Sequence, residues 1–203
     1  MTLIRRALIA LILVTAPVAA SAQTAPPPAV TAADRVLGRA DAPVTVIEYA
    51  SFTCSHCAHW HTSILPGFKA RFVDTGQVRL VFRNLPTPPV EVAARAAGIG
   101  LCAAPEQFFD VAGSLMIGQA ALLEGGPVTD WFSAAIARSG RTPEQVDACL
   151  ANPATLTSLR AEMAGAVAAG VPGTPAFFVN GQRVADTSLE GLSAAIRPLL
   201  PRS

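Results

Sequence analysis

Two cysteines separated by two residues form the part of the chain best suited to chemistry, the run Cys54-Ser55-His56-Cys57. The pair follows an apolar, β-branched run and opens a stretch with helical spacing, a context typical of redox-active pairs. Two intervening residues place both sulfur atoms on the first turn of a helix, close enough to bond to each other. The spacing therefore predicts a reversible disulfide between Cys54 and Cys57.

The two cysteines are expected to play different parts. We place Cys54 at or near the helix N-cap, where free backbone N–H groups and the helix dipole stabilise an anion and lower the pKa of a thiol. Because the thiolate is the form that attacks disulfides, Cys54 is the predicted nucleophile and the deeper Cys57 the predicted resolving thiol. His56 lies between them and is expected to favour the Cys54 thiolate further. A stabilised thiolate stabilises the reduced form and makes the disulfide a stronger oxidant.

Other interpretations of this run stay open. The pair could form an inert structural disulfide, although so short a loop constrains the unfolded chain little. The run also holds all three histidines of the chain, His56, His59 and His61, and with cysteine these are ligand types for zinc or copper. Side chains on one helix diverge around it, so we expect His59 and His61 to be partly exposed helix residues. Attachment of a c-type haem is excluded because Ala58 follows the second cysteine.

A second cysteine pair, Cys102 and Cys149, lies far apart in the sequence and on separate helical segments. In an oxidising compartment we expect the two to form a structural disulfide. Closing a loop of this length is worth about 4 kcal/mol in the chain-entropy model. Two buried free thiols and an auxiliary redox pair stay as alternatives.

The first residues are typical of an export signal. Arg5 and Arg6 precede an apolar run over Ala7–Ala16, and Ala20-Ser21-Ala22 has the small-residue pattern of a cleavage site. The apolar run is much shorter than the roughly 20 residues that cross a bilayer, which disfavours the alternative of a membrane anchor. We expect residues 1–22 to be a signal peptide cleaved after Ala22, which places the mature chain in the periplasm.

Composition limits the remaining chain to one folded domain. The 203 residues are 51% hydrophobic and 14% charged, which excludes a disordered chain. A net charge of +1 disfavours a protein that binds nucleic acid through bulk charge. Residues 23–33 are rich in proline and are expected to form a short extended tether. Residues 34–203 form the expected domain.

Hydrophobic periodicity and turn residues predict an α/β fold with a helical insertion. The expected strands are 44–50, 78–82, 176–179 and 182–185, the last two joined by a hairpin at Asn180-Gly181. The expected helices are 54–73 with a kink at Pro66, 90–101, 105–118, 129–138, 143–150, 153–169 and 188–199. The order is therefore β-α-β, an insertion over about 86–169, and β-β-α, which we expect to build one central sheet.

In this order and with this motif, the chain resembles the DsbA family of thioredoxin-fold thiol–disulfide oxidoreductases over roughly Val36–Leu199. Gly170–Gly181 resembles the second signature of the family. The resemblance implies that the Thr174–Pro175 peptide bond is cis and faces the cysteine pair, and that the Thr174 backbone binds an extended substrate segment. Glu48, six residues before the cysteine pair, matches an acidic residue that could relay a proton to or from Cys57. A salt-bridged structural glutamate is the alternative for Glu48.

The resemblance implies an enzyme that introduces disulfides into exported proteins and needs no cofactor beyond the Cys54–Cys57 disulfide. Its implied partners are reduced or unfolded polypeptides and a DsbB-like membrane protein that reoxidises it. Little chain separates Ala22 from the expected core, which favours a monomer. Ser55 stands where better-known oxidants of the family have proline, which leaves the redox potential open. The alternatives are a disulfide isomerase or reductase kept reduced in the periplasm, and a periplasmic metal-binding module.

Overall fold

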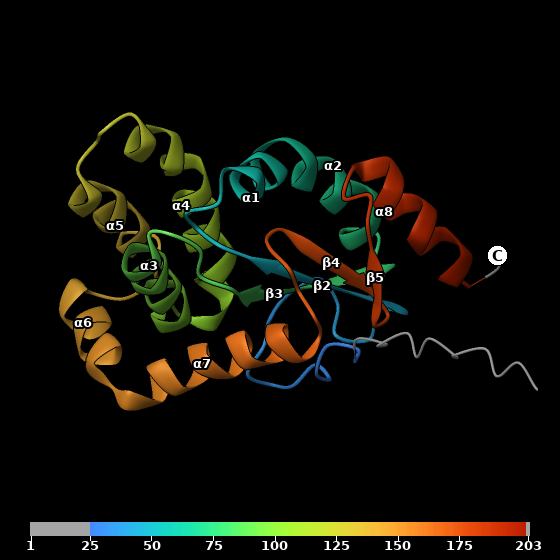
Figure 1. Cartoon of the computed structure of the whole chain (residues 1–203), viewed down its shortest axis with the longest axis horizontal. Helices are drawn as coiled ribbons and strands as arrows, with labels where there is room; N and C mark the ends of the chain where they lie inside the picture. The colour runs from blue at the N-terminus through green and yellow to red at the C-terminus, as the bar shows by residue number, and fades with distance from the viewer. Residues whose placement is uncertain (1–24, 202–203) are drawn as a thin grey trace, which may run out of the picture.

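The computed structural model describes residues 25–201, so the expected signal peptide and the first two residues of the tether lie outside the described residues. A five-stranded sheet runs through the centre in the order β1-β3-β2-β4-β5 (Figure 1). Its strands are β1 (Arg35–Leu37), β2 (Val44–Ala50), β3 (Val78–Asn84), β4 (Ala176–Val179) and β5 (Gln182–Val184). β2 and β3 are parallel and the other pairs are antiparallel. The predicted order of β-α-β, helical insertion and β-β-α is confirmed.

The connection from β2 to β3 is helical throughout and carries the cysteine pair at its start. It consists of α1 (Ser55–His59), the wide π-type turn η1 (Trp60–Ile64), α2 (Leu65–Phe68) and the π-type turn η2 (Lys69–Val73). Pro66, the expected kink, lies in the first turn of α2, where a missing N–H costs least. The wide turn before Pro66 accommodates the proline ring within the helix.

The insertion is all helical, and its helices before α7 lie at one end of the sheet (Figure 1). Its elements are α3 (Val90–Cys102), η3 (Pro105–Gln107), α4 (Phe108–Leu123), α5 (Val128–Ile136), α6 (Pro143–Ala151) and α7 (Pro153–Ala168). α4 continues beyond the predicted end at Gly118 because this glycine serves packing and does not end the helix. A Cβ at Gly118 would lie 2.8 Å from the ring of Trp131, so the glycine lets α5 approach α4 closely.

Helices cover both faces of the sheet. α1, α2 and α8 (Leu189–Ile196, followed by η4, Arg197–Leu199) lie over one face and α7 lies across the other (Figure 1). Alternation along β2 divides its side chains between these faces. Val44 and Val46 pack with Trp60 and Phe68 on the α1 face, whereas Tyr49 packs with residues of α7. Glu48 therefore shares the α1 face with Val44 and Val46.

The N-terminal segment is held against the α7 face. Arg83 of β3 donates to the carbonyl oxygens of Pro28 and Ala29 and forms an ion pair of 2.7 Å with Asp34. β1, which follows this segment, was not predicted, because three residues at a sheet edge are too few to show a periodic pattern. Within the described residues, no helix is long and apolar enough to cross a membrane.

Candidate active site

Cys54 occupies the junction between β2 and α1. Its backbone is extended (φ −89°, ψ 117°), and it is the N-cap residue of the helix. Its Sγ lies 3.2 Å from the carbonyl oxygen of Thr174. A hydrogen bond from Cys57 and the backbone N–H groups of Cys57 and His56 lower the pKa of Cys54 to about 5. The half-buried Cys54 is therefore held as an anion at neutral pH.

Cys57 lies one turn further along α1 and is fully buried. Both cysteines are free thiols, so the structure represents the reduced state. The hydrogen bond to Cys54, burial and the nearby charge of Glu48 raise the pKa of Cys57 well above its ordinary value. The pair therefore combines an accessible thiolate with a buried thiol that keeps its proton.

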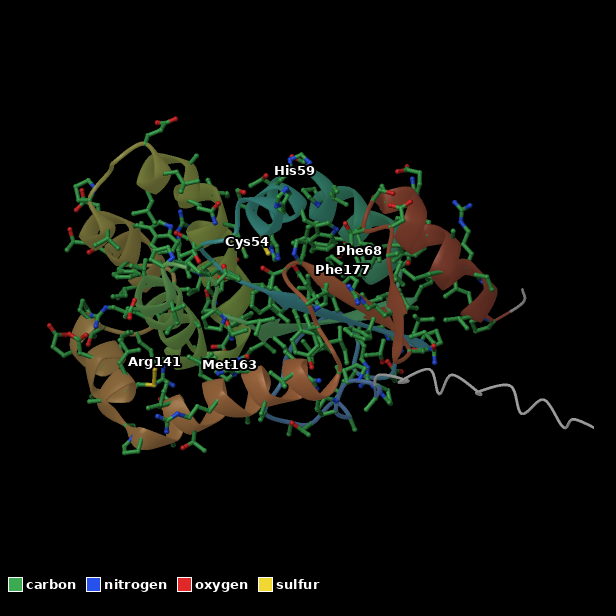
Figure 2. All side chains as sticks on the ribbon, in the orientation of Figure 1. Cys54, His59, Phe68, Arg141, Met163 and Phe177 are labelled. Atoms are coloured by element: carbon green, nitrogen blue, oxygen red, sulfur yellow. A yellow bond between two sulfur atoms is a disulfide. The ribbon has the colours of Figure 1, made fainter. Side chains whose placement is uncertain are left out.

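The loop before β4 lies directly against this pair. The Thr174–Pro175 peptide bond is cis, and the Thr174 carbonyl contacts the sulfur of Cys54. Figure 2 shows Cys54 where α1 begins, beside this loop and at the border of the helical insertion. Within the described part of the chain, the Thr174 hydroxyl is buried without a hydrogen-bond partner.

Beneath the helix, Glu48 of β2 is fully buried and pairs with a histidine. Both of its carboxylate oxygens lie 3.0 Å from Nε2 of His61 in η1. The expectation that His61 is a partly exposed helix residue is wrong, since its side chain is only 3% exposed. His61 directly follows the buried Trp60, and the acidic group on the strand below supplies its partner. A buried glutamate on a predicted core strand was the signal in the sequence that such a partner exists.

Comparison with known proteins identifies the family. The sequence profile of the thioredoxin family matches residues 30–197. The chain belongs to the thioredoxin family. A protein of Rickettsia bellii named as a protein-disulfide oxidoreductase is 29% identical over 175 residues, covering 84% of this chain and 66% of that protein. A Rickettsia conorii protein of the same description is 30% identical, covering 80% and 59%. The chain thus spans less than two thirds of the length of these relatives.

Solved structures show which thioredoxin-family proteins share this fold. Oxidised BdbD from Bacillus subtilis superposes with a TM-score of 0.73 at 20% identity, covering 87% of this chain and 97% of that chain. α-DsbA1 from Wolbachia pipientis gives a TM-score of 0.71 at 22% identity, covering 82% and 90%. The predicted resemblance to DsbA-family proteins and the predicted fold class are confirmed.

The three histidines at and just after the cysteine pair point in different directions. His56 is exposed, and its contribution to the Cys54 anion comes from its backbone N–H. His59 faces outward, near Ser63 (Figure 2), whereas His61 is buried against Glu48. Across residues 25–201, no group of three or more histidine, cysteine, aspartate or glutamate side chains is placed to hold a metal ion.

Gln119 of α4 positions the active-site loop and was not found from the sequence. Its Nε2 donates to the carbonyl oxygens of Phe52, at 2.6 Å, and Cys54, at 3.2 Å, so the insertion holds the segment that presents the nucleophile. Nothing in the pattern of α4 marks this polar residue, which lies on a buried face of the helix.

We expect Gln119→Leu to lower the free energy of unfolding by about 1–3 kcal/mol, because it leaves the buried carbonyl oxygen of Phe52 without its partner. The carbonyl oxygen of Cys54 keeps the N–H of Ala58. Urea unfolding of the reduced protein measures the loss. Gln182→Leu, at an exposed position of β5, is the matched control and should change stability by less than about 0.5 kcal/mol. Equal effects of the two substitutions would contradict this role for Gln119.

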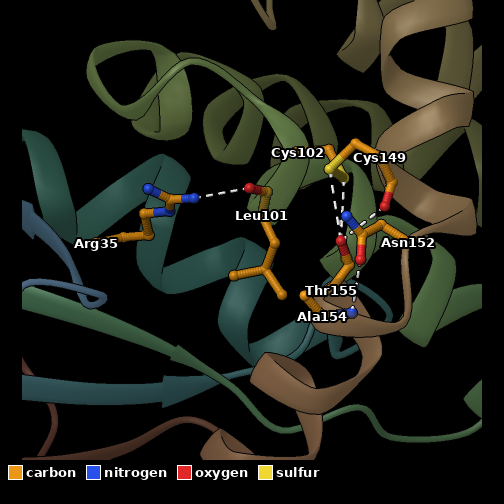
Figure 3. The surroundings of a disulfide bond; sticks show 7 residues. All are labelled: Arg35, Leu101, Cys102, Cys149, Asn152, Ala154 and Thr155. Carbon is orange, nitrogen blue, oxygen red and sulfur yellow. Dashed lines mark hydrogen bonds between the residues drawn. A yellow bond between two sulfur atoms is a disulfide. The ribbon is translucent and has the colours of Figure 1, made fainter.

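Cys102 and Cys149 are joined by a disulfide of 2.02 Å that links α3 to α6. Figure 3 shows Thr155 of α7 beside this bond, where its hydroxyl donates to the carbonyl oxygen of Cys149 at 2.7 Å. The disulfide and this hydrogen bond together connect three helices of the insertion. The disulfide is separate from Cys54, whose hydrogen-bond partners are Gln119 of α4 and Thr174 of the loop before β4.

Proposed function

We propose that the protein is a thiol–disulfide oxidoreductase that oxidises dithiols in substrate polypeptides through Cys54 and Cys57. One observation carries the proposal. The helix N-cap holds Cys54 as an accessible thiolate while Cys57 keeps its proton in the interior. This asymmetry assigns attack and release to Cys54 and resolution to Cys57.

The reaction follows from this asymmetry. A substrate thiolate attacks Sγ of Cys54 in the oxidised protein, the bond to Cys57 breaks, and the Cys57 sulfur takes up a proton. A second substrate thiolate then attacks the substrate sulfur of the mixed disulfide, which releases Cys54 as a thiolate and leaves the substrate with a disulfide. The half-buried loop at Thr174 and Pro175 binds the extended substrate segment through the Thr174 backbone, and Glu48 relays the proton of Cys57.

The direction of the reaction follows from the stability of the thiolate. An anion that is favoured in the reduced protein draws electrons from the substrate, so the oxidised protein acts as an oxidant. A disulfide isomerase or reductase kept reduced is the second candidate, because Ser55 replaces the proline of better-known oxidants. The divergent directions of the three histidines do not favour the metal-binding module.

Partners and location follow from the same proposal. The substrates are reduced or unfolded exported polypeptides, the compartment is the periplasm, and a DsbB-like membrane protein reoxidises Cys54 and Cys57. The protein acts as a monomer and needs no cofactor beyond its own disulfide. Disulfides persist in such an oxidising compartment, which agrees with the bond between Cys102 and Cys149.

Equilibration with glutathione tests the direction. We expect the Cys54–Cys57 pair to have a potential closer to about −120 mV, the value of a strong oxidant, than to the roughly −270 mV of a thioredoxin reductant. Mass mapping should assign the exchanging thiols to this pair, with Cys102 and Cys149 still bonded. A potential at the thioredoxin end would select the reductase, and exchange confined to Cys102 and Cys149 would refute the proposed site.

A further inference from the structure

The buried pair of Glu48 and His61 ends at a cavity that the reaction above does not use. This cavity, of about 240 Å³, lies between the helical connection and α4, and His61 forms part of its wall. Gly113 and Ile117 of α4 line it from the opposite side. Ile117 is 69% exposed, so the α4 side of the cavity borders solvent.

Glu48 itself has no exposed surface. Its neighbours in the sheet are Phe82 and Phe177, neither of which can accept a proton. Among the hydrogen bonds of the described residues, those of the Glu48 carboxylate go to His61 alone. A proton that Cys57 exchanges with Glu48 therefore reaches a dead end unless His61 passes it on.

We propose that His61 carries protons between Glu48 and the cavity, and so sets the rate at which Cys57 gains or loses its proton. The proposal rests on the proposed function, since it concerns the step in which Cys57 reacts. It makes His61 a proton-transferring residue that contacts neither sulfur. The cavity is then the entry for the water that exchanges the proton.

The transfers of protons and electrons are simplest to follow in the direction that closes the Cys54–Cys57 disulfide. The starting point is a mixed disulfide between Cys54 and a small-molecule thiol. The Cys57 thiol gives its proton to Glu48, and its sulfur bonds to Sγ of Cys54. The bond between Cys54 and the small molecule breaks, and its electron pair leaves with the small molecule as a thiolate. Glu48 passes the proton to Nε2 of His61, and His61 releases a proton to water in the cavity. One proton and one thiolate leave for each disulfide formed.

The surroundings of His61 fit this role. The rings of Trp60 and Phe82 enclose the imidazole at centroid distances of 5.4 and 5.7 Å, which keeps other polar groups away from its contact with Glu48. The charged groups that line the cavity with it are Lys69 of η2 and Asp110 of α4.

Oxidised glutathione separates the two steps in an experiment. Mixed with the reduced protein, it is first attacked by Cys54, and Cys57 then closes the disulfide. We expect His61→Gln to slow closure about 100-fold, the size of a general acid–base contribution. The Cys54–glutathione adduct should accumulate, as followed by acid quench and mass spectrometry. The attack by Cys54 should change less than twofold, because His61 does not contact that sulfur.

His59→Gln is the matched control, because it removes an exposed imidazole two residues away on the same helical connection. It should leave both steps unchanged. His61→Ala opens the wall of the cavity, and closure in this variant should be restored by added imidazole but not by pyrrole, a ring of the same size that is not basic. Closure at the wild-type rate in folded His61→Gln would overturn the proposal, as would equal rescue by the two rings.

A second pair of variants leaves Glu48 and His61 untouched. A Cβ at Gly113 would meet no atom within 4 Å, so a side chain fits there and would project into the cavity. Gly113→Leu should slow closure at least tenfold, whereas Gly113→Ala, which improves the helix equally without filling the cavity, should not. If the His61 variants do not fold, the two Gly113 variants test the proposal in their place. Equal closure rates in Gly113→Leu and Gly113→Ala would overturn it. Absence of both steps in the wild-type protein would instead refute the proposed function.

Discussion

Replacing Cys54 with alanine is expected to reduce disulfide transfer to the uncatalysed rate, because the variant lacks the sulfur that accepts the attack. Mixing the oxidised wild-type protein with a reduced model polypeptide and counting its disulfides by mass spectrometry gives the reference rate. Cys57→Ala keeps the Cys54 thiolate and is expected to accumulate a stable mixed disulfide with an activated substrate. Cys54→Ala is therefore expected to be inactive, whereas Cys57→Ala is expected to be trapped as a mixed disulfide.

The outcome depends on the distinct environments of the two sulfurs. Cys54 is half-buried beside Thr174, whereas Cys57 has no exposed surface. Adducts on Cys57 in Cys54→Ala at the rate seen on Cys54 in Cys57→Ala would show that the buried thiol is accessible. That result would invert the assignment of nucleophile and resolving thiol.

The reduced protein should lose stability as the pH falls from 9 to 5, relative to a reduced Cys54→Ser variant. Folding lowers the pKa of Cys54 from 9.0 to about 5. A group with a lowered pKa contributes stability that is fully present above the unfolded pKa and is lost as the pH falls to the folded pKa. At pH 7 this contribution is about 2 kcal/mol after allowance for solvent screening of a half-exposed group.

Urea unfolding under reducing conditions, at pH 7 and again below pH 5, measures this contribution. Carboxylates titrate in the same range, but they are common to both proteins and cancel in the difference. Above pH 9 the absolute stability of both proteins should fall, since Cys57, which both contain, keeps its proton in the folded state while the unfolded chain ionises. If the difference in unfolding free energy between the two proteins stays constant from pH 7 to below pH 5, Cys54 is not a thiolate in the folded protein at pH 7.

The parts of the site that are local in sequence could be predicted from it. The strand before the motif, the N-cap position of Cys54 and the Asn180-Gly181 turn each depend on a few adjacent residues whose chemistry permits few conformations. Asn180 and Gly181 both have positive φ, as the hairpin requires. The place of the Thr174 loop beside the cysteine pair came from the family resemblance and not from a local pattern.

The parts of the site that depend on tertiary contacts could not be predicted from the sequence. Whether the side chain of His61 is buried or exposed is decided by Glu48, thirteen residues away and on another element. No pattern in the sequence links these two residues. Gln119 is a polar residue in an apolar helix until the fold brings it to the carbonyl oxygens of the loop. Gly118 looks like a helix end until Trp131 lies over it.

Titration of the reduced protein, followed by the ultraviolet absorbance of the thiolate, tests the account most directly. The account predicts a transition with a midpoint at about pH 5 that belongs to Cys54 and is absent from Cys54→Ser. A wild-type midpoint near the ordinary cysteine value of about 8.5 would show that the helix N-cap and the hydrogen bond from Cys57 do not stabilise an anion at this sulfur, and the proposed oxidant would have no driving force.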